Sequence, residues 1–298
     1  MKRKFAVFIL THGRSDNVKT YDALRKCGYK GKIYLLVDDE DSEIAQYKAI
    51  YKNEVLVFPK QDAVKITDAG NNFGQKDSPV FARNWNFNVA KKLGLTHFLQ
   101  LDDDYTNFGW SCNNDLEFLS KSPTYETRKL DISIQAMLDF LDASGAFAVA
   151  WAQTGDFMGG PGSSAMQCIR GKIPMRKVMN SFFLRTDRPF CFLGTMNDDV
   201  SAYVSHGSRG MLFLTVPRIR LWQGVTQAKA GGLTDLYQAF GTYVKSFHTV
   251  LYAPSCTKIN TMGKTERRIH HRISWKQAVP LIISEKYRKR KDKKSHGN

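Results

Sequence analysis

The sequence predicts an α/β protein with a mixed sheet and helices on both faces. Over the first hundred residues, short apolar runs alternate with segments of helical periodicity, a pattern typical of parallel strands joined by helices. In the second half the apolar runs follow one another less regularly, which indicates strands of mixed direction. The 298 residues, 42% of them hydrophobic, suffice for one large domain or two modest ones.

The first half is predicted to begin as a β-α-β unit. Apolar runs of strand length occupy residues 5–10, 32–37, 54–58 and 97–101. Apolar residues recur at helical spacing in 17–27, 42–51 and 80–93. Because ligands of such sheets bind at the carboxyl ends of the strands, the residues that follow each run are the first candidates for a site.

The second half contains one predicted helix and three predicted strands. The helix covers 130–141, and the strands cover 147–152, 178–185 and 211–216. Glycines gather in 155–162 and at Gly231-Gly232. Such segments are typical of mobile loops that close over a substrate, and ordinary turns are the alternative.

Composition excludes several classes of protein. The longest apolar runs have the length of a strand and fall far short of the roughly 20 residues of a membrane helix, so we expect no membrane span. The basic start, Met1 to Lys4, precedes only a short apolar stretch without a cleavage site, which argues against secretion. Five scattered cysteines without a C-x-x-C pair indicate neither a disulfide framework nor a structural zinc, and fit a reducing cytoplasm.

The net charge of +16 predicts an anionic partner. From Lys264 to Asn298 there are 12 Lys or Arg and 3 Asp or Glu, so this end carries +9 and the first 263 residues carry +7. A surplus of this size raises the local concentration of polyanions such as nucleic acid. The segment Lys286 to Lys294 is predicted to be a flexible cationic tether, with a merely solubilising tail as the alternative.

Three adjacent carboxylates, Asp102, Asp103 and Asp104, follow the apolar strand 97–101. Adjacent anions repel one another, so a cation is expected to compensate them. Mg²⁺ or Mn²⁺ prefers oxygen ligands and commonly takes one or two carboxylates together with substrate phosphates. The triplet therefore predicts a metal site, and a solvated acidic turn is the alternative.

Two other strand ends carry candidate nucleotide ligands. The first strand runs into a glycine turn that offers backbone donors and an arginine, as in a phosphate loop, although an ordinary β-α turn fits as well: Thr11, His12, Gly13 and Arg14. The second strand ends in Asp38 and Asp39, either of which could accept hydrogen bonds from a base or ribose.

The helix before the acidic triplet begins with Arg83 and Asn84 in its first turn. Both side chains can donate to a diphosphate, and surface polar residues are the alternative.

Taken together, these segments resemble the nucleotide-sugar half of a GT-A-fold glycosyltransferase. The segments that carry the resemblance occur in the expected order over residues 5–105: Thr11 to Arg14, Val37 to Asp39, Ala82 to Asn84 and Asp102 to Asp104. The resemblance implies that Asp102 and Asp103 contact the nucleotide-sugar, and that Asp102 and Asp104 hold Mn²⁺ or Mg²⁺.

A second acidic motif, within Phe192 to Tyr203, resembles the helix start from which inverting members of this fold deprotonate the acceptor. An alcohol is a poor nucleophile at neutral pH, so a positioned carboxylate must take its proton. Asp198 or Asp199 is the candidate base, with helix capping as the alternative. If the enzyme is retaining, this pair needs another role.

Enzymes of this fold often add a late histidine to the metal. The resemblance implies His270 or His271 in this role, followed by His248, and a histidine that only satisfies structural hydrogen bonds is the alternative.

The segments 258–280 and 283–289 are similar to one branch of these enzymes, the TET/JBP-associated glycosyltransferases of phages and base-J-forming protists. The resemblance implies transfer of a sugar from a UDP-linked donor, UDP-glucose or a UDP-pentose, to 5-hydroxymethylcytosine or 5-hydroxymethyluracil in DNA. It also implies a phage-encoded protein in the cytoplasm of the host cell. The predicted division of the chain is a core, 1–257, with halves 1–105 and 106–257, a segment that completes the active site, 258–285, and the basic tail, 286–298.

Two other functions fit the same motifs less well. A glycosyltransferase for a polysaccharide or protein acceptor shares the donor motifs but does not need the basic surplus. A non-catalytic DNA-binding module would use the basic end alone. Three aromatic residues near the predicted acceptor loops are candidates for stacking on a flipped base, with core packing as the alternative: Trp110, Phe157 and Trp222.

Overall fold

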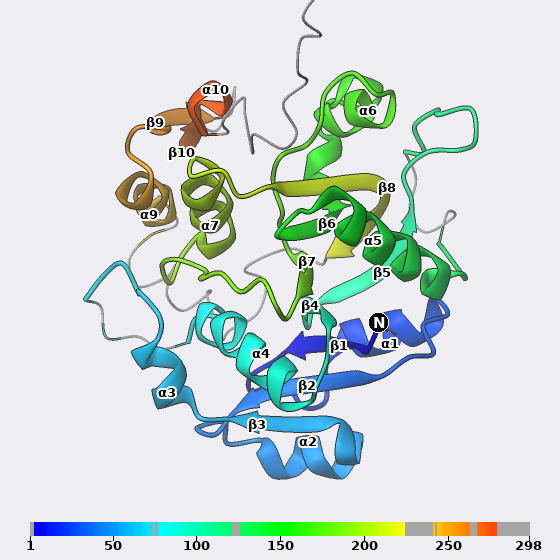
Figure 1. The fold of residues 1–298 in the computed structure, drawn as a ribbon, viewed down its shortest axis with the longest axis vertical. Helices are drawn as coiled ribbons and strands as arrows, with labels where there is room; N and C mark the ends of the chain where they lie inside the picture. Colours follow the sequence, from blue (N-terminus) through cyan, green and yellow to red (C-terminus); the bar gives the residue numbers. More distant parts are fainter. Residues whose placement is uncertain are drawn as a thin grey trace, which may run out of the picture.

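The computed structural model describes residues 3–72, 74, 77–120, 126–223, 241, 243–262 and 267–278. These residues form one mixed eight-stranded sheet with helices on both faces, and a separate two-stranded hairpin (Figure 1). The predicted α/β class with a mixed sheet is confirmed. The strands of the large sheet lie in the order β3-β2-β1-β4-β7-β6-β8-β5.

The first four strands of the chain are parallel and form one half of the sheet. They match the predicted apolar runs within one residue at each end: β1 (Phe5–Leu10), β2 (Ile33–Asp38), β3 (Val55–Phe58) and β4 (His97–Asp102). Leu10 is level with Leu36 on one side and with Asp102 on the other. The loops that leave β1, β2 and β4 therefore meet at one edge of the sheet.

The other half of the sheet mixes strand directions. Its strands are β5 (Tyr105–Trp110), β6 (Ala148–Gln153), β7 (Ser181–Arg185) and β8 (Phe213–Gln223). β7 is antiparallel to β4 and β6, β8 is parallel to β6, and β5 is antiparallel to β8. β5 was not among the predicted strands. β8 continues past the predicted end at residue 216 because Ile219 and Leu221 keep its apolar face buried.

The predicted helices form with shifted ends, and shorter ones appear between them. The helices are α1 (Lys19–Lys26), α2 (Ile44–Tyr51), α3 (Lys60–Lys65), α4 (Val80–Lys92), α5 (Leu130–Ser144), α6 (Ser164–Ile169), α7 (Asp198–Gly207), α9 (Val244–Tyr252) and α10 (Trp275–Ala278). Short 3₁₀ turns form η1 (Lys52–Glu54), η2 (Thr154–Phe157) and η3 (Gly160–Gly162). The predicted glycine loop at 155–162 thus consists largely of 3₁₀ turns, and Gly231-Gly232 lies outside the described residues.

The core has two layers because alternate side chains of a strand point to opposite faces of the sheet. Phe8 and Phe98 pack with residues of α4 and α7 on one face. Val7 and Leu99 pack with residues of α1 and α5 on the other. Helices on both faces therefore hold the strands, and the strand ends stay free for a site.

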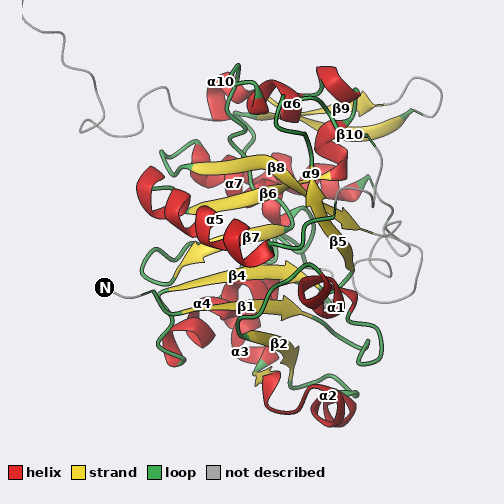
Figure 2. Cartoon of the chain, turned by 90° about the vertical axis from the view of Figure 1, so that its right-hand side faces the viewer, coloured by secondary structure: helices red, strands yellow, loops and turns green. Residues whose placement is uncertain are grey.

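The hairpin consists of β9 (Thr257–Met262) and β10 (Arg268–Ile273) and packs against α9. Figure 2 shows it at the end of the molecule toward which β1 and β4 run. All five cysteines are free. Among the described residues, no helix is long and apolar enough to cross a membrane. The predicted basic tail, 286–298, lies outside the described residues.

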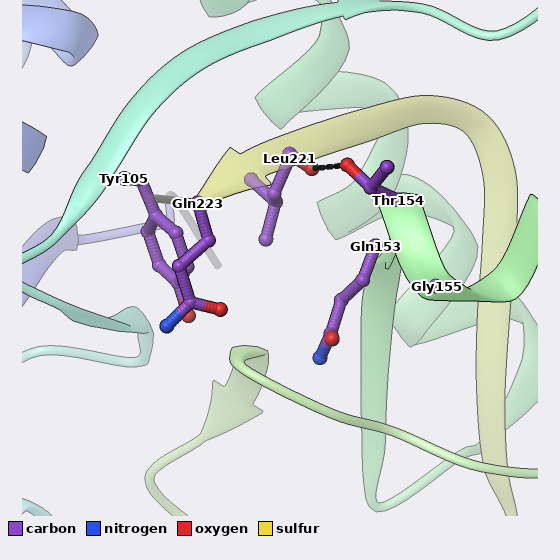
Figure 3. A pocket seen from close by; sticks show the side chains of 6 residues that line it. All are labelled: Tyr105, Gln153, Thr154, Gly155, Leu221 and Gln223. Carbon is purple, nitrogen blue, oxygen red and sulfur yellow. Dashed lines mark hydrogen bonds between the residues drawn. The ribbon is translucent and has the colours of Figure 1, made fainter. Parts of the chain in front are cut away.

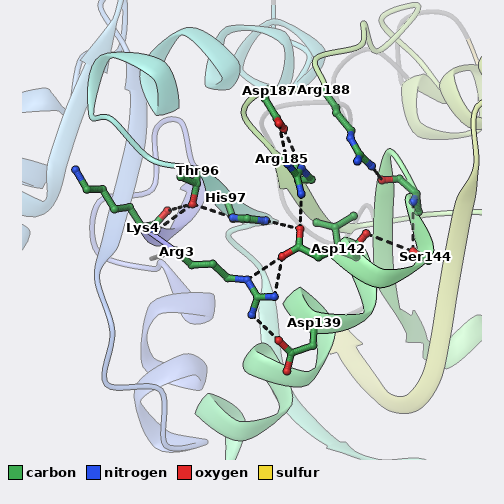
Figure 4. A network of polar contacts seen from close by, with 12 residues as sticks. Arg3, Lys4, Thr96, His97, Asp139, Asp142, Ser144, Arg185, Asp187 and Arg188 are labelled. Carbon is green, nitrogen blue, oxygen red and sulfur yellow. Dashed lines mark hydrogen bonds and ion pairs between the residues drawn. The ribbon is translucent and has the colours of Figure 1, made fainter. Parts of the chain in front are cut away.

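A network of ion pairs between side chains lies at the opposite edge of the sheet. Asp142 of α5 accepts from Arg3, just before β1, from His97 at the start of β4, and from Arg185 at the end of β7 (Figure 4). Because His97 and Asp102 are the two ends of β4, this network lies one strand length from the acidic triplet.

Candidate functional site

A buried arginine joins two of the predicted acidic motifs. Arg83 lies in the first turn of α4 and is 3% exposed. Its Nη2 donates to both carboxylate oxygens of Asp102, at 2.9 and 3.1 Å, and its Nη1 donates to Oδ2 of Asp198 at 2.7 Å. The structure therefore brings the end of β4 and the start of α7 together around one guanidinium, although 96 residues separate the two aspartates.

Burial and charge shift the pKa values of this group. Burial lowers the pKa of Arg83, but the charges of Asp102 and Asp198 outweigh it, so that the pKa is raised and the guanidinium stays charged. Burial raises the pKa of Asp198 and of Asp199, and the charge of Arg83 counteracts only part of that rise. A carboxylate with a raised pKa is a stronger base than an exposed aspartate.

Asp103 faces away from its two acidic neighbours, because successive side chains at a strand end alternate. Its Oδ2 accepts from the Thr11 hydroxyl at 2.8 Å, and its Oδ1 accepts from Nη1 of Arg14 at 3.0 Å. Tyr47 of α2 completes this cluster, since its hydroxyl lies 2.8 Å from Oγ1 of Thr11 and accepts from the backbone N–H of Arg14. Asp103 thus fixes the loop after β1.

The residues predicted to contact the nucleoside lie together in the loops after β1 and β2. Nδ1 of His12 and Oδ2 of Asp38 are 2.7 Å apart, and this contact raises the pKa of His12. Burial of Asp38 opposes ionisation, but the contact with His12 and the charge of Lys60 leave its pKa lowered. Gly13, at φ +60°, turns its N–H toward Oδ2 of Asp41 at 2.8 Å.

Two predicted ligands of the nucleotide are occupied by the protein's own backbone. Oδ1 of Asp39 accepts from the N–H of Lys60 at 2.8 Å. Asn84 receives the Phe192 N–H on Oδ1 at 2.7 Å and donates to the Phe192 carbonyl at 3.1 Å. Asn84 therefore ties α4 to the segment that leads into Asp198.

Asp104 has one buried oxygen without a partner. Its Oδ2 accepts from Nε2 of Gln223 at 2.8 Å, whereas Oδ1 is buried and has no hydrogen-bond partner among the described residues. Burial, reinforced by the charge of Asp102, raises the pKa of Asp104 to about 6. An unpaired buried carboxylate oxygen is costly unless another group satisfies it.

A small cavity of about 90 Å³ lies at the ends of β6 and β8, and its lining residue Gln223 donates to Asp104. Figure 3 shows the side chains of Gln153 and Gln223 directed into it, with Tyr105 along one side. Nε2 of Gln153 is buried and has no partner among the described residues. One water needs roughly 10–15 Å³, so the cavity can take a polar group of several atoms beside Nε2 of Gln153.

Of the histidines predicted as metal ligands, His271 lies beside the start of α7. His271 has its Nδ1 3.2 Å from Nδ2 of Asn197, directly before Asp198, and its ring centroid lies 4.3 Å from that of His270. Burial and the charge of His270 lower the pKa of His271 to about 4. His248 is buried and contacts Asn71. Among the described residues, no three His, Cys, Asp or Glu side chains gather as metal ligands.

The candidate stacking residues have different surroundings. Phe157 is buried and stacks on Phe118, so it packs in a small core. Trp222 lies under the guanidinium of Arg220, at 4.5 Å from the ring centroid. Trp110 is 40% exposed and can reach a ligand.

Sequence reasoning missed several residues of the site. Asp41 and Tyr47 follow the predicted second strand but showed no motif, and Lys60 is a buried lysine within 3.5 Å of Asp38. Gln153 ends β6 and lies level with Leu221 of β8, a strand pairing that the sequence did not reveal. Gln223 could not be predicted as a site residue, because β8 was expected to end at residue 216 and in fact ends at Gln223.

The chain belongs to the TET-associated glycosyltransferase family, whose model matches residues 5–232. The family is described as one of glycosyltransferases, which agrees with what the motifs at the strand ends predicted. No curated protein matches the chain significantly.

Several solved structures are similar to the chain. TarS of S. aureus has a TM-score of 0.44 and 12% identity, and the match covers 83% of this chain and 40% of that one. The mannosyltransferase PcManGT of Pyrobaculum calidifontis, in complex with GDP-Man and Mn²⁺, has a TM-score of 0.45 and 12% identity over 85% of this chain and 63% of that one. Glucosyl-3-phosphoglycerate synthase of Mycobacterium tuberculosis has a TM-score of 0.42 and 8% identity over 94% and 88%.

Proposed function

We propose that the protein transfers a sugar from a UDP-linked nucleotide-sugar to the hydroxyl of a 5-hydroxymethylpyrimidine in DNA. The observation that carries the proposal is the pair of contacts from Arg83 to Asp102 and Asp198. A group-transfer enzyme must hold the donor and the base for the acceptor at one place. Arg83 joins the strand end expected to hold the donor to the helix start expected to activate the acceptor.

The residues fit a divalent metal at the acidic triplet. Asp104 offers a buried carboxylate oxygen without a partner among the described residues. The negative charge of Asp102 acts on Asp104 and raises its pKa, so a cation would relieve the repulsion between the two carboxylates. Mg²⁺ and Mn²⁺ commonly bind through one or two carboxylates and substrate phosphates, so a larger protein cluster is not required. Asp102 and Asp104 would hold the metal. His270 and His271, predicted as further ligands, do not gather with these two carboxylates in the described residues, so our proposal gives the metal no histidine ligand. Such an ion, when bound, stabilises the charge that develops on a departing diphosphate.

The remaining donor contacts come from the loops after β1 and β2. Arg14 neutralises the phosphates, and Thr11 and Asp103 hold Arg14 in place for this role. Arg83, predicted to share this role, is buried with both Nη atoms on Asp102 and Asp198, so it neutralises those carboxylates instead. The nucleoside part of the donor is contacted by His12, Gly13, Asp38 and Asp39. The cavity at the ends of β6 and β8 receives part of the sugar, where Gln153 donates to a hydroxyl group.

Asp198 activates the acceptor in our proposal. Its raised pKa allows it to take the proton from the hydroxymethyl oxygen as that oxygen attacks the sugar carbon. Asp199 is the alternative base, although its Oδ1 accepts from the backbone N–H of Val200.

DNA is the acceptor that the charge favours. A net charge of +16 suits a polyanion that binds through phosphate contacts. The segment 258–285 would complete the site, and the contact of His271 with Asn197 supports this placement. The tail, Lys286 to Lys294, would tether the DNA.

The test incubates the full chain with Mn²⁺, a panel of nucleotide-sugars and three DNA duplexes that contain hydroxymethylcytosine, hydroxymethyluracil or unmodified pyrimidines. Mass spectrometry of the digested nucleosides is expected to show a sugar increment on a hydroxymethylated base only. An increment on unmodified DNA would contradict the proposal, as would no increment on any modified DNA while a polysaccharide or protein acceptor is glycosylated.

A further inference from the structure

The hairpin carries two positive side chains directly opposite each other. Lys258 of β9 pairs in register with Arg272 of β10, and both residues are exposed. Like charges at directly opposed positions of an antiparallel pair destabilise it. Neither residue forms an ion pair with any described residue that would offset the repulsion.

The pair faces away from the body of the protein. The neighbouring register pair, Thr257 and Ile273, lies on the inner side, where Thr257 is buried and Ile273 packs against the core. Because consecutive residues of a strand point to opposite faces, Lys258 and Arg272 point outward.

The described residues at this end of the chain carry charges of one sign. The described residues 243–262 and 267–278 contain no Asp or Glu. Their cationic residues are Lys245, Lys258, Arg267, Arg268, Arg272 and Lys276. A surface of this kind is stabilised when a polyanion binds to it.

The hairpin lies beside the proposed base. His271 of β10 contacts Asn197, the residue before Asp198, at 3.2 Å between Nδ1 and Nδ2. The hairpin is also at the end of the sheet to which β1 and β4 run (Figure 2). Because His271 and Arg272 are consecutive in β10, the outer face lies on the far side of the hairpin from this contact, and the thickness of the hairpin separates phosphates bound there from the start of α7.

We propose that the outer face of the β9–β10 hairpin binds the sugar-phosphate backbone of DNA through Lys258 and Arg272. The proposal deepens the proposed function and rests on it for the choice of DNA. Phosphate contacts position a duplex without reading its sequence, so the hairpin sets where the DNA lies while another part of the site selects the modified base.

The test measures binding of the full chain to a fluorescent unmodified duplex, without donor, between 50 and 200 mM salt. The variant K258Q/R272Q is expected to bind more weakly, with a salt slope of log K against log[salt] that is smaller by about 2, one for each lost phosphate contact. The matched control, K91Q/K92Q, loses the same charge at the far end of α4, where both lysines are exposed, and is expected to keep the wild-type slope.

Thermal unfolding separates binding from folding. Removal of the opposed charges is expected to leave the melting temperature unchanged or raised, whereas a merely structural role of the pair would lower it. Equal binding and equal slope for wild type and K258Q/R272Q would overturn the proposal. So would an equal loss in both double variants, or a loss of binding to phosphatidylserine vesicles without a loss of DNA binding.

The result is independent of sugar transfer. If the hairpin variant alone loses DNA affinity but the wild type glycosylates no modified DNA, the hairpin proposal stands and the proposed acceptor fails. If transfer to modified DNA occurs and the variant binds DNA as the wild type does, the proposed function stands and the hairpin proposal fails.

Discussion

Arg83 and Asp198 form a buried ion pair, with 2.7 Å between Nη1 and Oδ2 and side chains that are 4% and 5% exposed. The same guanidinium holds Asp102, so that three charges from two helices and a strand depend on one another. Removal of one member of a buried pair leaves an uncompensated charge. Substitutions here therefore have to preserve shape if they are to report on chemistry.

Asp198→Asn keeps the shape of the side chain and removes the proposed base. We expect kcat for transfer to fall by about 10²–10⁴-fold, with a small change in KM for the donor. Asp199→Asn is the matched control on the same helical turn and is expected to lose much less. Wild-type kcat should rise with pH through the raised pKa of Asp198, because the base acts in its ionised form. Steady-state rates of the wild type and both variants, measured across pH, show which aspartate is the base. A larger loss of kcat in Asp199→Asn would assign the base to Asp199.

Asp104 links stability to pH in the metal-free protein. Its folded pKa of about 6 lies above the ordinary value of 3.8, so the folded state binds the proton more tightly and stability falls as pH rises from about 4 to 6. Asp104→Asn removes this cost, and we expect the free energy of unfolding at pH 7 to rise by up to about 3 kcal/mol, with no difference below pH 4.

Mn²⁺ provides the complementary measurement at Asp104. The ion is expected to raise the melting temperature of the wild type at pH 7 in a concentration-dependent way, because it binds the folded state, and to affect Asp104→Asn much less. An equal shift in both proteins would show that the ion binds elsewhere.

Asn84→Ala tests whether this residue acts on the loop or on the nucleotide. The change leaves the N–H and the carbonyl of Phe192 without their partner, which costs about 1–3 kcal/mol per buried group. We expect the free energy of unfolding to fall by about 2–4 kcal/mol and kcat to fall, because the segment before Asp198 loosens. The affinity for the nucleotide, measured by calorimetry, should stay near the wild-type value. A selective loss of nucleotide affinity would instead place Asn84 on the diphosphate.

Asp142→Asn tests the ion network at the opposite edge of the sheet. Burial of Asp142 opposes its ionisation, but the contacts with His97, Arg3 and Arg185 outweigh it and lower the pKa to about 2. The stabilisation is present above about pH 4, the ordinary pKa of an aspartate in the unfolded chain, and is lost as pH falls from about 4 to 2. Because the side chain is 27% exposed, we expect Asp142→Asn to cost only about 1–2 kcal/mol at pH 7. Denaturant unfolding at pH 7 and pH 3 measures this, and kcat and KM should not change.

Much of the parallel half of the sheet was predictable from the sequence. Apolar runs of the right length give strands wherever both faces are covered, and Leu10, Leu36 and Asp102 come level because their strands are parallel neighbours. The clustering of the loops after β1, β2 and β4 follows from that arrangement. The second half was less predictable, since β5 and the β9–β10 hairpin have polar sequences that show no clear apolar run.

The sequence by itself determined the fold class, the strand ends that carry polar residues and the excess of positive charge, because these depend on periodicity and composition along the chain. Only the tertiary structure decided which of those residues meet. Asp103 turned toward Arg14 and Asp102 toward Arg83, because adjacent side chains alternate at a strand end. Arg83 reached Asp198 across 115 residues because α4 and α7 pack on the same face of the sheet, where burial strengthens the attraction between their charges.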